Sequence, residues 1–578
     1  MGKKSILFLL TLIFFTGLSL TLHTQTAEAK TLTGSCGKNA VWKYNDKTKV
    51  LEITGKGALT KRIKLKNKEV KEIIVGEGIT AISSRVVFEQ SHSGHGLERL
   101  VLPDSLEKIS VRAFAGLRFI NKTITLPENV KTIEPGAFWG ANYLEEIKVS
   151  EKNKYFVSKD GVLFSKDYKT LICYPEEKKT ENYKIPETVT EIKPMAFALN
   201  FYIQKVHLPE GLRKLGGGAF YACLKLSDIN LTRQSKITEI TDYDGRKAGQ
   251  HSAIISEYEL LYDYDSYITL LEKEPQTEEP AYYHFGTFEG TSLKSVEIPD
   301  GVKYLPSKTF QSLDWYDPDD EYTSGPRLEE ITLGKNFIGE INTGDGLYSE
   351  DSFYLAQNYY WLKSIKVAKG NPKYMVKNNI LYSKDGKTLY QAFSGAQKKN
   401  LIIGSKVKRI ANGAFFRMQG IKKVTVKGKL DSIGLLAFAG CSMKKFTAKK
   451  DIQKIGAGAF TECKQLIEFD CKKNVHSIGK NAFASCYKLE TVQLGRKLSY
   501  LGKEAFSGCI TLKEITLAGN LKEIPDRAFD GCSKLKKITF PDNVSFAQHA
   551  FAFCDSLTKV VKTPVTFYWG KQYLKRVV

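Results

Sequence analysis

Cysteine is the residue whose spacing most clearly suggests chemistry in this sequence of 578 residues. Seven of the ten cysteines follow a phenylalanine by three residues: Cys223, Cys441, Cys463, Cys486, Cys509, Cys532 and Cys554. After other phenylalanines the same position holds residues without a thiol: Leu117, Ala141, Asn200 and Met418. We therefore predict buried thiols, because cysteine packs well as a small hydrophobic residue. Disulfides between neighbouring copies are the alternative.

Two polar clusters are candidates for metal binding. His92 and His95 stand in a glycine-containing loop with no third ligand nearby, so we predict no metal there. Residues 314–321 include five carboxylates that could gather calcium: Asp314, Asp317, Asp319, Asp320 and Glu321. This segment lacks the central glycine and the closing glutamate of an EF-hand, so calcium remains only an alternative.

Motifs for catalysis or cofactor binding are incomplete. Gly386-Lys387-Thr388 matches the end of a phosphate-binding loop, but Leu381 stands where the motif needs glycine. Neither a Gly-x-Ser-x-Gly turn nor a His-Glu-x-x-His helix occurs. We predict no catalytic residue, no cofactor and no metal, and hence a protein that is not an enzyme.

A repeat of about 23 residues positions the cysteines. Phenylalanines recur at nearly constant steps in the last third of the chain: Phe415, Phe438, Phe460, Phe483, Phe506, Phe529 and Phe551. A fixed period in this range is typical of a solenoid, in which each unit buries its apolar face only against its neighbours. The sequence therefore predicts one elongated body.

Each repeat contains two apolar patterns. Ala-Phe-x-x-Cys-x-x-Leu, as in residues 505–512, spaces apolar residues three and four apart, which predicts a short helical turn. Leu-x-x-Ile-x-Leu, as in residues 512–517, ends in alternation, which predicts a short strand with one buried face. Together these motifs resemble the bacterial BspA-type leucine-rich repeats. The resemblance implies a β-rich leucine-rich-repeat solenoid with short parallel strands, short helical turns and an N-terminal β cap around residues 34–42.

The chain divides into six predicted segments. Lys3 and Lys4, an apolar run and Ala27-Glu28-Ala29 indicate a signal peptide over residues 1–29, cleaved after Ala29. No later apolar run is long enough to predict a transmembrane helix. The remaining segments are a capping segment at 30–72, repeats at 73–232 with a hairpin variant at 153–173, degenerate repeats with insertions at 233–360, repeats at 361–562 with a hairpin variant at 371–393, and a tail at 563–578. The tail either caps the solenoid or once led into an anchoring module.

The central segment differs in charge from the rest of the chain. Residues 231–360 contain 25 Asp plus Glu against 10 Lys plus Arg, whereas the whole chain has a net charge of +23. Fourteen of the 29 tyrosines lie there. Insertions in solenoids often form the binding face. The alternative is that these acidic loops fold back on the basic coils.

From these features we predict an exported, non-enzymatic binding protein of the bacterial surface. The resemblance implies adhesion to host proteins or neighbouring cells through a protein or polysaccharide ligand, and we expect no nucleic acid. The expected contacts are lysines of the repeat strands and tyrosines of the insertions: Lys423, Lys445, Lys537, Lys559, Tyr262, Tyr264, Tyr316 and Tyr322. An alternative role is a structural protein held electrostatically on anionic cell-wall polymers.

Overall fold

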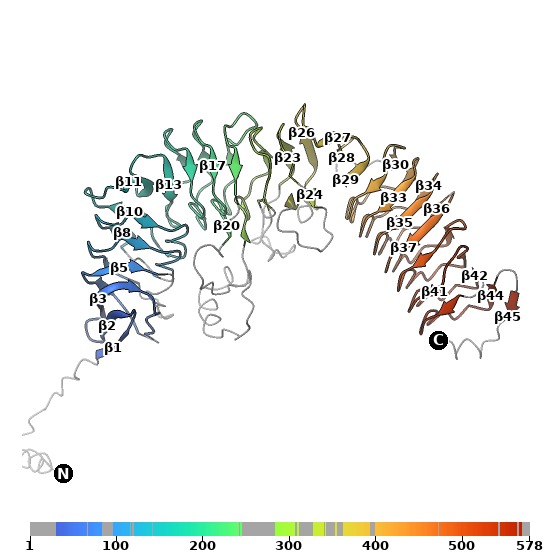
Figure 1. The fold of residues 1–578 in the computed structure, drawn as a ribbon, viewed down its shortest axis with the longest axis horizontal. Helices are drawn as coiled ribbons and strands as arrows, with labels where there is room; N and C mark the ends of the chain where they lie inside the picture. The colour runs from blue at the N-terminus through green and yellow to red at the C-terminus, as the bar shows by residue number, and fades with distance from the viewer. Residues whose placement is uncertain are drawn as a thin grey trace, which may run out of the picture.

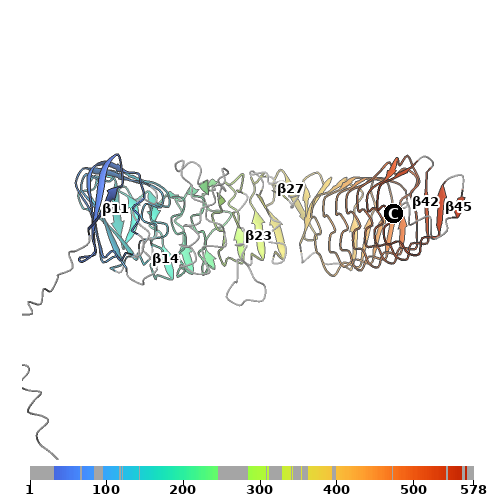
Figure 2. The same ribbon diagram turned by 90° about the horizontal axis from the view of Figure 1, so that it is seen from below.

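The computed structural model of the chain is an arch of stacked coils, coloured from blue at β1 to red at β45 in Figure 1. Seen from below, the coils follow one another in a single row (Figure 2). The structure describes residues 31–568 except for 66, 67, 84–95, 116, 118, 120, 142, 242, 245–283, 307, 308, 311–327, 340, 343–352, 355–361, 394–398, 472, 542, 543 and 563–565. The predicted signal peptide lies outside the described residues.

Each regular coil has three sides. One side carries the parallel strands that we call the strand wall: β30 (Asn400–Ile403), β32 (Lys423–Val426), β34 (Lys445–Ala448), β36 (Glu468–Cys471) and β38 (Thr491–Gln493). The second side carries the second sheet: β27 (Tyr374–Lys377), β28 (Ile380–Ser383), β29 (Thr388–Ala392), β31 (Arg409–Ile410), β33 (Leu430–Ile433), β35 (Ile452–Ile455), β37 (Val475–Ile478) and β39 (Tyr500–Leu501). The third side, the turn wall, contains the Ala-Phe-x-x-Cys segments.

The same two sheets continue to the last coils. The strand wall extends through β40 (Glu514–Thr516), β42 (Lys537–Phe540), β44 (Lys559–Lys562) and the antiparallel β45 (Thr566–Tyr568). The second sheet extends through the parallel pair β41 (Glu523–Ile524) and β43 (Ser545–Phe546). Antiparallel β45 ends the parallel series of the wall.

An antiparallel meander begins the solenoid: β1 (Thr31–Ser35), β2 (Asn39–Asn45) and β3 (Val50–Leu59). The long strand β3 pairs with β4 (Glu72–Val75) through its first half and with β5 (Ile79–Ile82) through its second half. One strand therefore starts both sheets. The two sheets continue with β6 (Arg99–Val101), β7 (Lys108–Ile109) and β9 (Thr132–Ile133).

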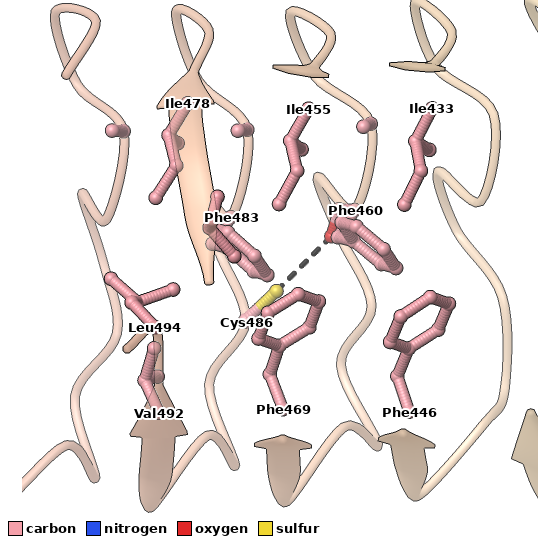
Figure 3. Close-up of a cluster of buried hydrophobic side chains, with 14 of the residues drawn as sticks. Ile433, Phe446, Ile455, Phe460, Phe469, Ile478, Phe483, Cys486, Val492 and Leu494 are labelled. Atoms are coloured by element: carbon pink, nitrogen blue, oxygen red, sulfur yellow. Dashed lines mark hydrogen bonds between the residues drawn. The ribbon is translucent and has the colours of Figure 1, made fainter. Parts of the chain in front are cut away.

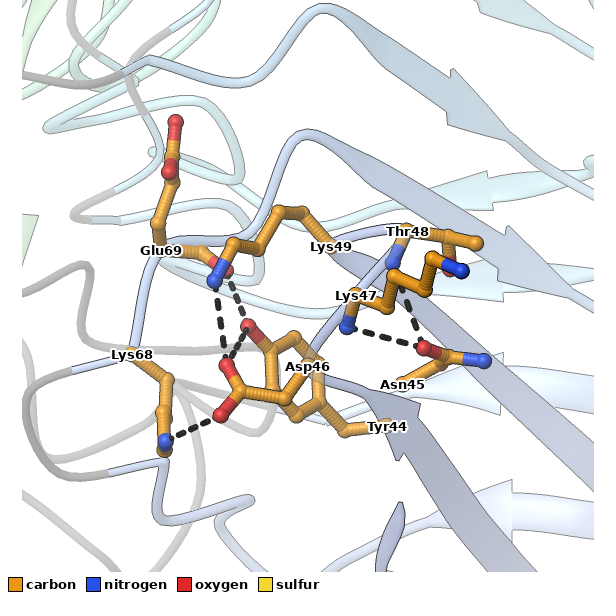
Figure 4. Close-up of polar contacts among 8 residues, drawn as sticks. All are labelled: Tyr44, Asn45, Asp46, Lys47, Thr48, Lys49, Lys68 and Glu69. Carbon is orange, nitrogen blue, oxygen red and sulfur yellow. Dashed lines mark hydrogen bonds and ion pairs between the residues drawn. The ribbon is translucent and has the colours of Figure 1, made fainter. Parts of the chain in front are cut away.

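Polar contacts fix the turn between β2 and β3 (Figure 4). The buried Tyr44 hydroxyl donates to the Glu69 carbonyl at 2.6 Å. The Asp46 carboxylate contacts Lys68 Nζ at 2.6 Å and Lys49 Nζ at 3.0 Å. Hydrogen bonds from these two ammonium groups lower the pKa of Asp46 to about 2. The cap is thus joined to the segment that leads into the first coil.

Coils between the cap and the insertions repeat this plan with one hairpin variant. Their strand-wall elements are β8 (Thr123–Leu126), β10 (Glu146–Val149), β14 (Asn182–Lys184), β16 (Lys205–His207) and β18 (Asp228–Ile229). Their second sheet is β11 (Phe156–Lys159), β12 (Val162–Ser165), β13 (Thr170–Cys173), β15 (Glu191–Ile192), β17 (Lys214–Leu215) and β19 (Glu239–Ile240). β11, β12 and β13 pair antiparallel, as β27, β28 and β29 do in the second variant.

Central coils keep the parallel stacking despite long intervals in sequence. Their strand wall is β22 (Ser295–Glu297), β23 (Glu330–Leu333) and β26 (Ser364–Val367). Two short strand pairs flank segments that lie outside the described residues. They are β20 (Tyr243–Asp244) with β21 (His284–Phe285), and β24 (Ile341–Asn342) with β25 (Phe353–Tyr354). β20 and β24 lie toward the inside of the arch in Figure 1.

The turn wall differs from the predicted short helical turns, because no helix occurs in the described residues. Alternate N–H groups bond within the coil, as Cys486 N donates to Phe483 O at 3.3 Å, and the others donate to the next coil, as Phe483 N donates to Ala505 O at 2.8 Å. Residues two before and two after the phenylalanine have positive φ, 55° at Asn481 and 57° at Ser485. A helix would need every N–H inside the coil and negative φ throughout.

The core is a column of phenylalanine rings that passes from coil to coil. Phe483 and Phe506 stack with centroids 5.0 Å apart, and Phe506 and Phe529 with centroids 5.3 Å apart. Figure 3 shows Phe460 and Phe483 between a row of isoleucines and the Phe446–Phe469 pair. All these rings are fully buried.

Candidate binding surface

The outward-facing residues of the strand wall form rows that run from coil to coil. The first residues of successive strands lie beside one another in the order Asn400, Lys423, Lys445, Glu468 and Thr491. Later coils continue with Glu514, Lys537 and Lys559. The structure therefore places the four lysines as two neighbouring pairs, separated by two glutamates and a threonine.

The lysines of this row differ in their surroundings. Lys423 is exposed, whereas Lys445 is half-buried and its Nζ contacts both carboxylate oxygens of Glu468 at 2.6 Å. An ion pair on the surface stabilises the fold by at most about 1 kcal/mol, but it reduces the local positive charge. Lys445 is therefore already engaged within the wall.

The third residues of the strands form a second row of hydrogen-bonding side chains: Thr425, Thr447, Asp470, Gln493, Thr516 and Thr539. Thr447 and Asp470 are almost completely covered, with 8% and 1% of their surfaces exposed, whereas Gln493 and Thr516 are exposed. The wall thus offers polar contacts through its first row and through the exposed members of its second row, which is interrupted where Thr447 and Asp470 are covered.

Six of the seven repeat cysteines are buried and Cys554 is half-buried, and all seven act as hydrogen-bond donors. All ten cysteines are free thiols, as predicted for the seven in the repeat position. Each of those seven Sγ atoms donates to the carbonyl of the phenylalanine in the preceding coil, as Cys486 does to Phe460 at 3.1 Å (Figure 3). Burial raises the pKa of Cys509 to about 12. These thiols are part of the core and not a nucleophilic site.

Comparison with protein families gives a match over most of the chain. The model described as "BspA type Leucine rich repeat region" matches in six copies over residues 63–160, 172–246, 281–315, 388–512 and 476–566. The chain belongs to the BspA-type leucine-rich repeat family.

Solved structures that match this BspA-type chain are distant from it in sequence. A leucine-rich repeat protein from Eubacterium ventriosum is 17% identical with a TM-score of 0.43, and the match covers 94% of this chain and 97% of that one. The pneumococcal vaccine antigen PcpA is 15% identical with a TM-score of 0.33, covering 94% and 95%. A leucine-rich cell surface protein from Faecalibacterium prausnitzii is 17% identical with a TM-score of 0.28, covering 94% and 97%. A search of curated proteins found no match.

The sequence analysis did not predict that the residue three positions after the repeat phenylalanine donates a hydrogen bond. We call this position the slot. In this BspA-type chain Asn200 fills the slot, and its Nδ2 donates at 3.0 Å to three carbonyls of the preceding coil, those of Pro175, Glu176 and Lys178. Thr291 donates to Phe288 O at 2.9 Å. The residue types at the slot could have indicated this, because cysteine, asparagine and threonine all carry a hydrogen-bond donor. Alanine, leucine and methionine, which carry none, fill the slot in other coils.

Several predicted sites fall outside the described residues. These are the insertion tyrosines Tyr262, Tyr264, Tyr316 and Tyr322, the His92–His95 loop and the acidic residues 314–321. Across the described part of the chain, no group of three or more His, Cys, Asp or Glu is placed to hold a metal. Within that part, no helix has the length and apolar character needed to cross a membrane.

The repeat surface has one open hollow beside the strand wall. It encloses about 320 Å³ between residues 208–212 and 230–237. Its lining has one carboxylate, Glu210, and one ammonium group, Lys236, with no histidine or cysteine. The lining also includes two hydroxyl groups, those of Thr232 and Ser235, and the Ser235 hydroxyl accepts a hydrogen bond from Thr232 N at 3.0 Å.

Proposed function

We propose that this chain is an exported, non-enzymatic binding protein of the bacterial surface that holds a protein ligand against its strand wall. The observation that carries the proposal is the pair of polar rows, which run in register across the coils from β30 to β38. The seven coils from Phe415 to Phe551, stacked about 4.8 Å apart, give a surface roughly 30 Å long. Such a surface binds through many modest contacts spread along an extended ligand.

The proposed contacts divide into charged and aromatic groups. Lys423, Lys445, Lys537 and Lys559 would attract an acidic partner, and this attraction weakens as salt shortens the screening length from about 10 Å at 0.1 M to about 3 Å at 1 M. The insertion tyrosines, Tyr262, Tyr264, Tyr316 and Tyr322, are of a type enriched at binding hot spots. Their contribution should resist salt.

The test begins with a ligand captured from host matrix or mucus by the mature chain. Binding is then measured for two variants, the four wall lysines changed to glutamine and residues 258–283 deleted. The matched control changes four lysines outside the wall, of which Lys408 is half-buried and the others exposed: Lys408, Lys454, Lys480 and Lys503. We expect the lysine variant to lose the salt-sensitive part of binding and the deletion to lose the salt-resistant part.

Two results would contradict the proposal. Full binding by both folded variants would move the contact to the cap around Trp42 or the tail around Trp569. Retention of residues 1–29 in the mature protein, measured by intact mass, would remove the exported role.

A further inference from the structure

A row of cations lies at the corner between the strand wall and the second sheet. A short link joins each wall strand to the second sheet, for example residues 427–429 between β32 and β33. In successive coils these links carry Lys427, Lys429, Lys449, Lys450, Lys473 and Arg496. Lys406 and Lys497 extend the row by one cation at each end. We call these eight residues the basic corner.

The cations of the basic corner are exposed and unpaired. All eight side chains are exposed, and among the described residues none of them lies in an ion pair. The links contain a single carboxylate, Asp451, which accepts hydrogen bonds from the Asn474 backbone at 3.2 Å and side chain at 3.3 Å. The corner thus differs from the wall, where Lys445 already contacts Glu468.

Stacking concentrates this charge along a line. Coils lie about 4.8 Å apart, so five coils bring the eight cations within roughly 20 Å. That length is about two screening lengths at 0.1 M salt, so the fields of neighbouring cations add. At the positions that correspond to Arg496 and Lys497 the next coil holds Gly519 and Asn520, and its link has one cation, Lys522, directly before β41. The basic corner is therefore a bounded strip.

The residue types favour one class of ligand. Lysine is depleted in protein interfaces, where Trp, Tyr and Arg supply most hot spots. Single-stranded nucleic acids are held mainly by aromatic side chains that stack on bases, and the links contain no aromatic residue. Lysine binds phosphate as a point charge without fixed geometry, which suits a flexible chain.

We propose that the basic corner binds a linear, flexible polymer of phosphate diesters, laid along the corner from coil to coil. Each coil would meet a different phosphate, so affinity would increase with polymer length up to the length of the strip. This site does not depend on the proposed ligand of the strand wall, because none of its residues belongs to the wall rows.

The test compares two charge-matched variants of the full mature chain. The corner variant is K427Q/K429Q/K449Q/K450Q, and the control is K422Q/K444Q/K464Q/K480Q, four exposed lysines of neighbouring coils outside the links. Lys422 and Lys444 directly precede β32 and β34, whereas Lys427 and Lys449 directly follow these strands, so half of the control removes charge from the other end of the same strands. Fluorescence anisotropy with labelled poly(glycerol phosphate) is measured from 50 to 300 mM salt.

We expect the corner variant to bind at least about tenfold more weakly at 100 mM salt. Its slope of log affinity against log salt should fall by about 3. The control should lose less than about threefold. Equal losses in both variants, or no loss in the corner variant, would overturn the site.

Three further probes test the ligand class. An oligothymidylate or a heparin fragment of equal charge should bind more weakly than poly(glycerol phosphate). Vesicles containing phosphatidylglycerol should bind the corner variant and the wild-type chain equally well. Tighter binding of the oligothymidylate would assign the corner to nucleic acid, and tighter binding of heparin to sulfated polysaccharide. Vesicle binding that the corner variant abolishes, with no polymer binding, would assign it to a membrane surface.

Discussion

The C-terminal coils and the central coils differ far more in sequence spacing than in the spacing of their cores. Phe483 and Phe506 are 23 residues apart, and their ring centroids lie 5.0 Å apart. Phe220 and Phe288 are 68 residues apart, yet their centroids lie 5.4 Å apart. The backbone contact is also preserved, because Phe220 N donates to Thr287 O at 2.9 Å. The phenylalanine column and the turn-wall hydrogen bonds therefore fix the fold, while the segment between the second sheet and the turn wall accepts an insertion.

The two regions differ in how the slot after the phenylalanine joins the coils. Cys509 donates to Phe483 in the preceding coil, whereas Thr291 donates to Phe288 in its own coil. The C-terminal coils thus have a thiol contact between neighbours that the Phe288 coil does not show. Mutations in the two regions can test whether this thiol contact gives them different stabilities.

The largest expected effect comes from truncating one ring of the column. Phe506→Ala should cost about 3–5 kcal/mol, because Phe506 is fully buried between two stacked rings. Hydrogen exchange should show lost protection in the coils of Phe483 and Phe529 and unchanged protection in the Phe220 coil. Uniform loss from Phe114 to Phe551 would instead indicate one cooperative unit.

Alkaline pH should lower the stability of the C-terminal coils more than that of the Phe288 coil. This effect is smaller than that of Phe506→Ala. The pKa of Cys509 is raised to about 12 from about 9 when unfolded, so between pH 9 and 12 the unfolded state binds fewer protons. Stability therefore falls as pH rises through that window, by about 2 kcal/mol per such thiol at pH 10.5. Urea unfolding with proteolytic mapping should show the C-terminal coils opening before the Phe288 coil.

The control for this prediction removes titrating thiols. Cys486→Ala combined with Cys509→Ala should reduce the difference in stability between pH 8 and pH 10.5. An unchanged difference would mean that other groups, such as Tyr44, whose pKa is also raised to about 12, set the alkaline limit.

Removing one thiol at neutral pH should have a modest effect. Cys509→Ala should cost on the order of 1 kcal/mol, because packing and the weak thiol hydrogen bond are lost while the Phe483 carbonyl keeps its bond from Cys486 N. In the native wild-type chain the repeat thiols should resist iodoacetamide and react after unfolding. A Cys486–Cys509 disulfide found by mass spectrometry would contradict this prediction.

The smallest effect concerns backbone conformation in the turn wall. Ser485 and Gly508 occupy the same position of adjacent coils, with φ of 57° and 72°. Ser485→Gly should stabilise by roughly 0.5–1 kcal/mol and Gly508→Ala should destabilise by about 1 kcal/mol. A Cβ at Gly508 would meet Ser485 only at 3.5 Å, so the change isolates the effect of φ in thermal unfolding. If both substitutions changed the stability equally, packing and not φ would determine the stability at this position.

The period of the phenylalanines was enough to predict stacked coils, and the resemblance to leucine-rich repeats implied the parallel strands. It did not predict the turn wall, because apolar residues three and four apart occur equally when alternate N–H groups bond between coils. The glycines at 440, 508 and 531 gave the better signal, since glycine readily adopts positive φ. Contacts between coils, such as Lys445 with Glu468, depend on register and could not be read from one repeat.

The repeat pattern also did not predict the basic corner, because this feature too depends on how the coils stack. Its cations occupy shifting places in the links, Lys427 and Lys429 in one coil and Lys449 and Lys450 in the next. An alignment by period finds fixed positions, whereas charge acts over several ångströms and tolerates a shift of one or two residues. Only stacking in space shows that the cations form one line.

The repeated interface between coils also determines how the array would respond to mechanical force. Pulled apart at its ends, the stack would load its interfaces in series, and each yields separately because a coil touches only its neighbours. One coil of 23 residues would lengthen the chain by about 75 Å, since an extended residue spans about 3.5 Å and the stacked coil only about 5 Å. The regular C-terminal coils would therefore extend in nearly equal steps, and the central coils with insertions in longer ones.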